Sequence, residues 1–228
     1  AIACLVSGVL SSFAFDVVLR QRLGGLNMSE FVMVEAPLPR RSETMERCAR
    51  SLVLSTSMCA QLFSEEWLTL SNPKTSRWKE IWALLPARRR EKLAAFDALV
   101  AAWFGLTVEL VREAFHDCDW PAGQAPSQFN VKGFWRLDRQ KEPELRRTIL
   151  TMAAVQELCV TVVSHAGNRE SAAEAFCSQN GGEGWRLAAA LRLADIGMGH
   201  DARAEVDQPV ASRFGPRFLD WQLAQTAE

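Results

Sequence analysis

The sequence has no tyrosine, three histidines, and five lysines against 21 arginines. Its six cysteines are scattered, and no two of them form a Cys-x-x-Cys pair. Structural zinc sites and disulfide frameworks depend on closely spaced cysteine and histidine residues, so we predict neither and expect no metal site. Scattered thiols are typical of the reducing cytoplasm, which is therefore the expected location.

The sequence also lacks the short motifs that mark many enzymes. Gly-x-Gly-x-x-Gly, Gly-x-x-x-x-Gly-Lys-Ser/Thr, Gly-x-Ser-x-Gly and His-Glu-x-x-His are all absent. Close approach of backbone amides to a phosphate or dinucleotide needs such a glycine-rich turn. The run His116–Asp119 offers ligand-type atoms, but four successive residues of a helix cannot all face one ion, so we interpret it as a solvated helix end. The residues alone predict no catalytic centre.

What remains is an ordinary globular composition without an excess of charge. Of 228 residues, 48% are hydrophobic and 23% charged, which suits one sizeable core or two small ones and excludes general disorder. The 26 basic residues face 27 acidic ones, so any preference for nucleic acid must be local. The apolar run of residues 1–15 lacks the basic n-region of a signal peptide and leads directly into the charged residue Asp16. We therefore predict neither a signal peptide nor contact with a membrane.

The hydrophobic spacing predicts a mainly α fold, a multi-helix assembly. Helices are expected over residues 2–19, 41–68, 75–84, 87–104, 108–115, 143–163 and 184–197. Pro86 and Pro143 suit the first turns of their helices, Gly105 suits a helix end, and Thr107 suits an N-terminal cap.

One short β element is expected near residues 30–36, as part of an incomplete target-recognition domain. The segment FVMVEAP (31–37) is rich in β-branched residues and leads into Pro-Leu-Pro, which is typical of a strand with an extended exit. The apolar stripe along residues 2–17 is expected to need a partner, since a lone helix cannot bury such a face.

Two segments combine basic residues with tryptophan. Residues 72–92 hold seven basic and two acidic side chains, and residues 132–147 hold six and three. Arginine beside aromatic residues can neutralise phosphates and stack on bases. Charged helix faces are nevertheless usually just solvated, and tryptophans at helical spacing, such as Trp103, are better explained as core. Trp135 is the exception, because it follows a polar loop and has basic residues on both sides.

Three stretches of the sequence resemble a known family. The run LSSFAFDVVLRQRLGGLNMSEFVMVEAPLPR (10–40) is similar to the closing segment of the target-recognition domain in large adenine-specific DNA methyltransferases of restriction-modification systems, and to their BREX- and DISARM-like phage-defence relatives. KLAAFDALVAAWFGLTVELV (92–111) and KGFWRLDRQKEPELRRTIL (132–150) resemble segments further downstream in that family. The chain departs from the family pattern at Ser11, where Asn is common, and at residues 36–39, where Gln-Leu-Pro is common.

The resemblance implies the part of an adenine-N6 DNA methyltransferase that lies downstream of the catalytic domain. The family's glycine-rich S-adenosylmethionine turn and its Asn/Asp-Pro-Pro-Tyr/Phe motif are both missing, and Asn72-Pro73 is followed by Lys74. S-adenosylmethionine is therefore implied for an upstream catalytic domain or subunit, with no cofactor in this chain. Double-stranded DNA and that upstream domain or subunit are the implied partners. Whether the chain counts as an enzyme in its own right stays open.

We expect three regions: a closing recognition segment at 1–40, a helical region at 41–115, and a C-terminal helical region with an irregular tail at 116–228. The chain would position DNA without catalysing methyl transfer. The candidate DNA contacts are Arg20, Arg22, Lys74, Arg77, Lys79, Arg88, Arg89, Arg90, Lys132, Trp135, Arg136 and Arg139. The alternative is a helical protein-interaction module that docks on the methyltransferase core or on a defence partner and never contacts DNA.

Overall fold

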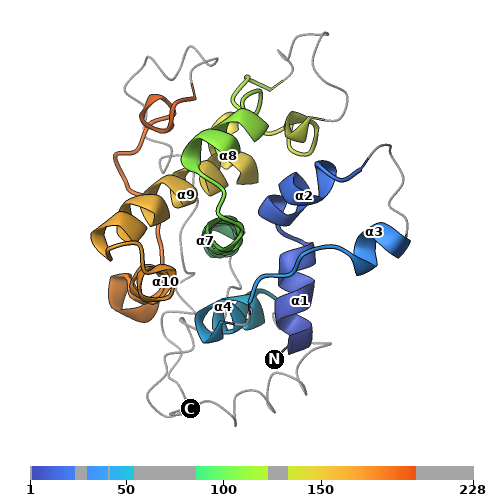
Figure 1. The fold of residues 1–228 in the computed structure, drawn as a ribbon. Helices are drawn as coiled ribbons and strands as arrows, with labels where there is room; N and C mark the ends of the chain where they lie inside the picture. Colours follow the sequence, from blue (N-terminus) through green and yellow to red (C-terminus); the bar gives the residue numbers. More distant parts are fainter. Residues whose placement is uncertain (1, 24–29, 41, 54–85, 123–132, 199–228) are drawn as a thin grey trace.

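The computed structural model describes residues 2–23, 30–40, 42–53, 86–122 and 133–198. Within these ranges the chain is mainly α-helical, as predicted, and contains no strand (Figure 1). The helices are α1 (Ile2–Leu10), α2 (Phe13–Arg20), α3 (Glu30–Val34), α4 (Glu43–Val53), α7 (Pro86–Phe104), α8 (Val108–Ala114), α9 (Arg147–Ser164) and α10 (Arg169–Ser178). Short 3-10 turns complete the described part.

Helix α7 runs through the middle of the assembly. Figure 1 shows it end-on, with α9, α10, α4, α1 and α2 around it. Every residue from Ala94 to Ala101 is buried, and a helix that is covered on all sides must be apolar nearly all round. The predicted limits of this helix are confirmed, since it begins at Pro86 and ends before Gly105, whose φ is 72°. Thr107 caps α8 as predicted, accepting the Leu110 N–H.

The predicted single helix over residues 2–19 is instead a bent pair. Helices α1 and α2 meet at an angle of 62°, and Ser12 lies at the corner. Its Oγ accepts the Phe15 N–H at 3.1 Å and donates to the Val9 carbonyl at 2.8 Å. Serine is a strong N-cap because its hydroxyl replaces a missing intrahelical partner, so a new helix begins there.

The bend lets the chain bury part of the apolar stripe of this segment. Leu5 and Val9 of α1 and Phe15 and Leu19 of α2 are buried in the core, because α1 packs on α4 and α2 packs on α7. Ile2 and Leu10 of the same stripe stay 59% and 41% exposed, so the expectation that this face needs a partner is wrong only for the part that the chain buries.

The predicted β element is also wrong, because residues 30–34 form the short helix α3. A strand satisfies its backbone groups through a neighbouring strand, and the described ranges offer none. One helical turn satisfies them locally, and the Ala36 N–H continues this pattern by donating to the Met33 carbonyl.

The two expected C-terminal helices differ from the prediction as well. Residues Pro143–Leu145 form a 3-10 turn, Arg146 is extended, and α9 begins at Arg147. Around Trp185 the chain is irregular rather than helical, with a single 3-10 turn at Ala194–Ile196. Contacts with α7 replace the intrahelical hydrogen bonds in the segment around Trp185.

The Leu187 N–H donates to the Glu91 carboxylate at 3.1 Å, and the Trp185 carbonyl accepts from Arg88. In this segment the side chains of Trp185 and Leu187 are buried. Tertiary contacts therefore override the helical spacing of the sequence here.

All three expected regions contribute to one core, which extends from Leu5 to Met198. Helix α9 has the length and hydropathy that a membrane span needs, and so do two bent pairs, α1 with α2 and α7 with α8. Half of α9 is buried inside the protein, where α7 is its main neighbour. Its apolar sequence thus forms a large part of this core.

Candidate functional site

A cavity of about 1070 Å³ lies where three segments of the described chain meet. One wall is the end of α2 with the residues after it, the second is the turn after α8 at residues 113–118, and the third is the segment 133–140. Figure 1 shows two of these segments near each other, α2 in blue and the yellow-green segment that precedes α9. Its size is in the range of pockets that hold small molecules or parts of larger ligands.

Four of the residues predicted to contact DNA line this cavity. Arg20 comes from the α2 wall, and Trp135, Arg136 and Arg139 come from the segment 133–140. They belong to two sequence segments that are more than 100 residues apart, and each was singled out for its own local pattern. The fold brings them to one place.

Arg20 is held in a fixed orientation at the cavity wall. Its Nε and Nη2 donate to the two oxygens of Asp16, each at 2.9 Å, and its guanidinium lies 4.1 Å from the centre of the Phe134 ring. Phe134 in turn packs edge-on against Phe13 and Phe115. A bidentate ion pair stacked on an aromatic ring restricts the guanidinium, which therefore forms a rigid part of the site.

Arg136 and Arg139 are the exposed arginines of the cavity. They flank Asp138 on a tight segment that begins with a 3-10 turn, Phe134–Arg136. The buried Phe134 anchors one end of this segment in the core, while Asp138 accepts the Arg147 N–H at the start of α9. Two solvent-facing guanidiniums are thus presented by a short segment that is fixed at both ends.

The cavity carries charges of both signs. Asp16, Glu113 and Asp117 line it together with the three arginines. Asp16 pairs with Arg20, and Asp117 lies 3.1 Å from His116 Nε2. Among the residues that line the cavity, the segment 133–140 contributes Arg136 and Arg139 and no carboxylate, so an anionic ligand would be attracted to that wall.

Cys118 is the thiol of the cavity, and its surroundings keep it protonated. Burial raises its pKa to about 12, against the smaller opposing effects of the Thr148 hydroxyl and of Arg146. A neutral buried thiol is a poor nucleophile, because the thiolate is the reactive form. Cys118 therefore serves as packing rather than as an attacking group.

The interpretation of His116–Asp119 as a solvated helix end is corrected in part. His116 is exposed, as expected, but Cys118 and Asp119 are buried. The chain turns inward after α8 so that Phe115 and Cys118 enter the core. Among the residues described by the structure, no group of three or more histidine, cysteine, aspartate or glutamate side chains could hold a metal ion.

The other described candidates are not among the residues that line the cavity. Arg22 donates to the Glu35 carbonyl at 2.8 Å, and Arg89 donates to the Leu52 carbonyl at 2.8 Å. Arg90 is half-buried in the first turns of α7. The predicted residues Lys74, Arg77, Lys79 and Lys132 lie outside the described ranges.

Arg88 has a role inside the protein instead of at its surface. It is only 1% exposed and pairs with Glu91 at 3.3 Å. It also donates to the Trp185 carbonyl at 3.3 Å. A buried guanidinium in this position cannot reach a phosphate, so its prediction as a DNA contact does not fit this structure.

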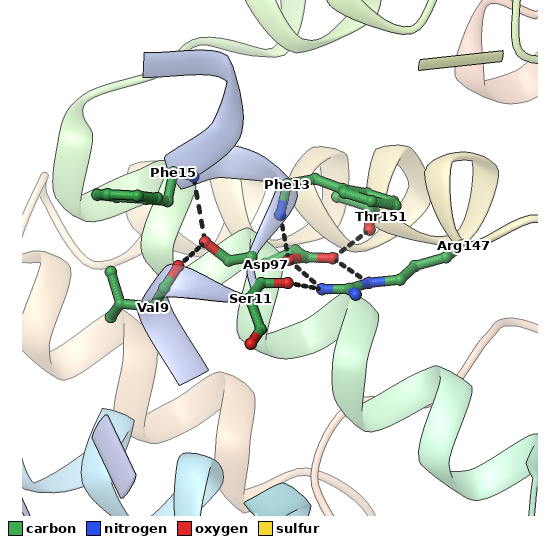
Figure 2. A network of polar contacts seen from close by, with 8 residues as sticks. Val9, Ser11, Phe13, Phe15, Asp97, Arg147 and Thr151 are labelled. Atoms are coloured by element: carbon green, nitrogen blue, oxygen red, sulfur yellow. Dashed lines mark hydrogen bonds and ion pairs between the residues drawn. The ribbon is translucent and has the colours of Figure 1, made fainter. Parts of the chain in front are cut away.

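Sequence reasoning missed a buried polar network in the centre of the molecule. Figure 2 shows Asp97 of α7 between the α1–α2 corner and α9. One Asp97 oxygen accepts from the Phe13 N–H at 2.9 Å and from Arg147 Nη2 at 2.7 Å. The other accepts from Arg147 Nε at 2.8 Å and from the Thr151 hydroxyl at 2.9 Å.

This network is structural, because the Asp97 carboxylate uses both of its oxygens on neighbours in the fold. Arg147 extends it to the Ser11 carbonyl at 3.0 Å, and its guanidinium lies 4.4 Å from the centre of the Phe13 ring. The sequence did contain a signal for it. An aspartate inside the apolar run LAAFDALVA must either face solvent or meet a buried partner.

Comparisons of this chain with protein-family models, curated proteins and solved structures find no match.

Proposed function

We propose that this chain is the DNA-positioning portion of an adenine-N6 DNA methyltransferase of a restriction-modification or phage-defence system. Methyl transfer would take place in an upstream domain or subunit. The supporting observation is that Arg20, Trp135, Arg136 and Arg139 line one cavity. These residues come from residues 10–40 and 132–150, which are two of the three stretches that resemble that family.

The cavity would bind the DNA backbone through charge. Arg136 and Arg139 are exposed, and an arginine guanidinium suits bidentate contact with phosphate oxygens. Arg20 and Trp135 complete the cavity lining. Phosphate contacts fix the register and orientation of a duplex but carry no sequence information, so the proposed role is positioning rather than base readout.

S-adenosylmethionine is assigned to the upstream part because the cavity does not fit it. Methyltransferases of this kind cradle the cofactor on a glycine-rich turn after a strand, where backbone amides can approach closely. The described ranges contain no strand, and Gly133 is the one glycine among the residues that line the cavity. The proposal therefore includes no methyl-transfer step in this chain.

The test compares DNA binding by the native chain and by the variants Arg136→Gln and Arg139→Gln. Binding is measured as the fluorescence anisotropy of a labelled duplex over a series of salt concentrations. Each lost phosphate contact should weaken binding regardless of sequence and lower the salt slope by about 0.9. Arg169→Gln is the matched control, because Arg169 is an exposed arginine on α10 that does not line the cavity. Binding that is absent, or that the three variants affect equally, would reject the proposal.

A protein-interaction role is the second candidate, and a separate surface favours it. Leu110 of α8 and Val160 and Val163 of α9 are 54%, 66% and 79% exposed, and these two helices pack together. Exposed aliphatic side chains on neighbouring helices are typical of a docking surface. Retention of an upstream subunit through this surface should change little with salt, whereas DNA affinity should fall steeply.

A further inference from the structure

Arg146 lies behind the cavity and joins two of its walls. It is only 2% exposed, and it does not line the cavity itself. Its guanidinium donates to four backbone carbonyls: those of Asp138 (3.2 Å), Lys141 (3.0 Å), Arg139 (3.4 Å) and Cys118.

These four carbonyls belong to different parts of the cavity. Cys118 is in the turn after α8, while Asp138, Arg139 and Lys141 are in or next to the segment that carries the exposed arginines. Arginine suits this position because its planar guanidinium has five N–H donors in a fixed geometry. One buried side chain therefore makes hydrogen bonds to two walls of the cavity.

A second set of contacts holds the same segment on α9. The Asp138 carboxylate accepts the Arg147 N–H at 3.2 Å and pairs with Lys141. This pairing fixes the turn to the start of α9 but does not reach the α8 wall. The rings of Phe115 and Phe134 also join these two walls, and Arg146 supplies the polar link between them.

We propose that Arg146 is a positioning residue for DNA binding, which holds the wall with Arg136 and Arg139 against the turn after α8. The inference rests on the proposed function, since it names the residue that places the phosphate-contacting arginines. Arg146 would act through those arginines and would make no contact with DNA.

The test is a double-mutant cycle between Arg146→Gln and Arg139→Gln in the full chain, measured by duplex binding at low salt. Arg146→Gln should weaken binding roughly tenfold, the equivalent of one misplaced charge-assisted contact. In the Arg139→Gln background the same change should weaken binding much less, because residues that act through one another are not additive. Arg146→Lys should restore part of the affinity.

A matched control separates positioning from loss of stability. Glu157→Gln disturbs a different α9 contact, in which Glu157 accepts from Trp185 and Gln179, and it should lower the melting temperature without weakening DNA binding. Arg146→Lys takes the place of Arg146→Gln throughout the cycle if the latter does not fold. Amide hydrogen exchange without DNA should show faster exchange at residues 137–141 in the Arg146 variants.

The possible outcomes distinguish the two proposals. If the native chain binds no duplex, the proposed function fails and this inference fails with it. If the native chain binds DNA but the Arg146 variants bind equally well, or if the losses add fully with Arg139→Gln, the inference alone is overturned. The inference is also overturned if Glu157→Gln weakens DNA binding as much as an Arg146 variant that has the same melting temperature.

Discussion

At the scale of single residues, Asp97 shows how a buried charge is accommodated. It is fully buried and accepts four hydrogen bonds, two of them from Arg147. Asp97→Ala would leave Arg147 without its carboxylate partner in a largely buried position, which typically lowers the free energy of unfolding by about 3–5 kcal/mol. Urea denaturation measures this loss.

The control for the Asp97→Ala variant is Glu174→Gln, which disturbs an exposed ion pair. Arg47 and Glu174 lie 2.9 Å apart, with about half of each side chain exposed. Exposed ion pairs contribute about 1 kcal/mol or less. Equal losses in Asp97→Ala and Glu174→Gln would show that the central network contributes no more than a surface pair.

Lys92 of α7 gives a pH-dependent prediction. Burial lowers its pKa from 10.5 to about 8. Below pH 8 the amine is charged in the folded and in the unfolded chain, and the folded chain bears the cost of the desolvated charge. Between about pH 8 and pH 10.5 the unfolded chain binds more protons, so the contribution of Lys92 to stability rises with pH.

We therefore expect Lys92→Met to be more stable than the native chain at neutral pH. This advantage should shrink as the pH rises from 8 towards 10, because native Lys92 loses its charge. Denaturant titrations of both proteins at several pH values measure the difference. A difference that stays constant between pH 6 and 10 would contradict the assignment of the effect to the Lys92 charge.

At the scale of secondary-structure elements, Ser12 determines where α1 ends and α2 begins. Its hydroxyl makes two hydrogen bonds, and the side chain is buried. Ser12→Ala should lower the free energy of unfolding by about 1–2 kcal/mol. The comparison is Thr107→Ala, which removes an exposed cap of α8 whose bond from the Leu110 N–H is longer, at 3.3 Å.

Thr107→Ala should cost less than Ser12→Ala, because solvent can replace the lost bond at an exposed cap. Thermal melts of the two variants give the comparison. A larger loss from Thr107→Ala would show that the α1–α2 corner does not depend on Ser12.

The elements that could be predicted are those with local signals at both ends. Helix α7 begins at Pro86 and ends before Gly105, and Thr107 starts α8. Each of these residues acts through its own backbone geometry or through a bond to a neighbouring residue. Such signals do not depend on the rest of the fold, so the sequence was sufficient.

The elements that could not be predicted depend on distant contacts. The irregular segment at Trp185 and Leu187 has helical spacing, but Arg88 and Glu91 of α7 bind its backbone. The residues 30–34 have strand composition but form α3. In both cases the surroundings decide between two local conformations that the sequence permits.

At the scale of the whole molecule, the sequence identified the arginines of the candidate site but not their arrangement. Arg20 and the pair Arg136 and Arg139 were selected from separate segments, and they line one cavity. Arg88 was selected in the same way and is buried. A basic sequence pattern cannot tell a surface arginine from an internal one, because both pair with carboxylates and carbonyls.

The position of the DNA on the chain is the central claim, and amide hydrogen exchange with and without a duplex tests it most directly. We predict that DNA slows exchange in the segments that line the cavity, namely residues 16–23, 113–118 and 133–140, and leaves α10 unchanged. Protection on α8 and α9 around Leu110 and Val160 instead, or no protection anywhere in the presence of a saturating duplex, would contradict the account.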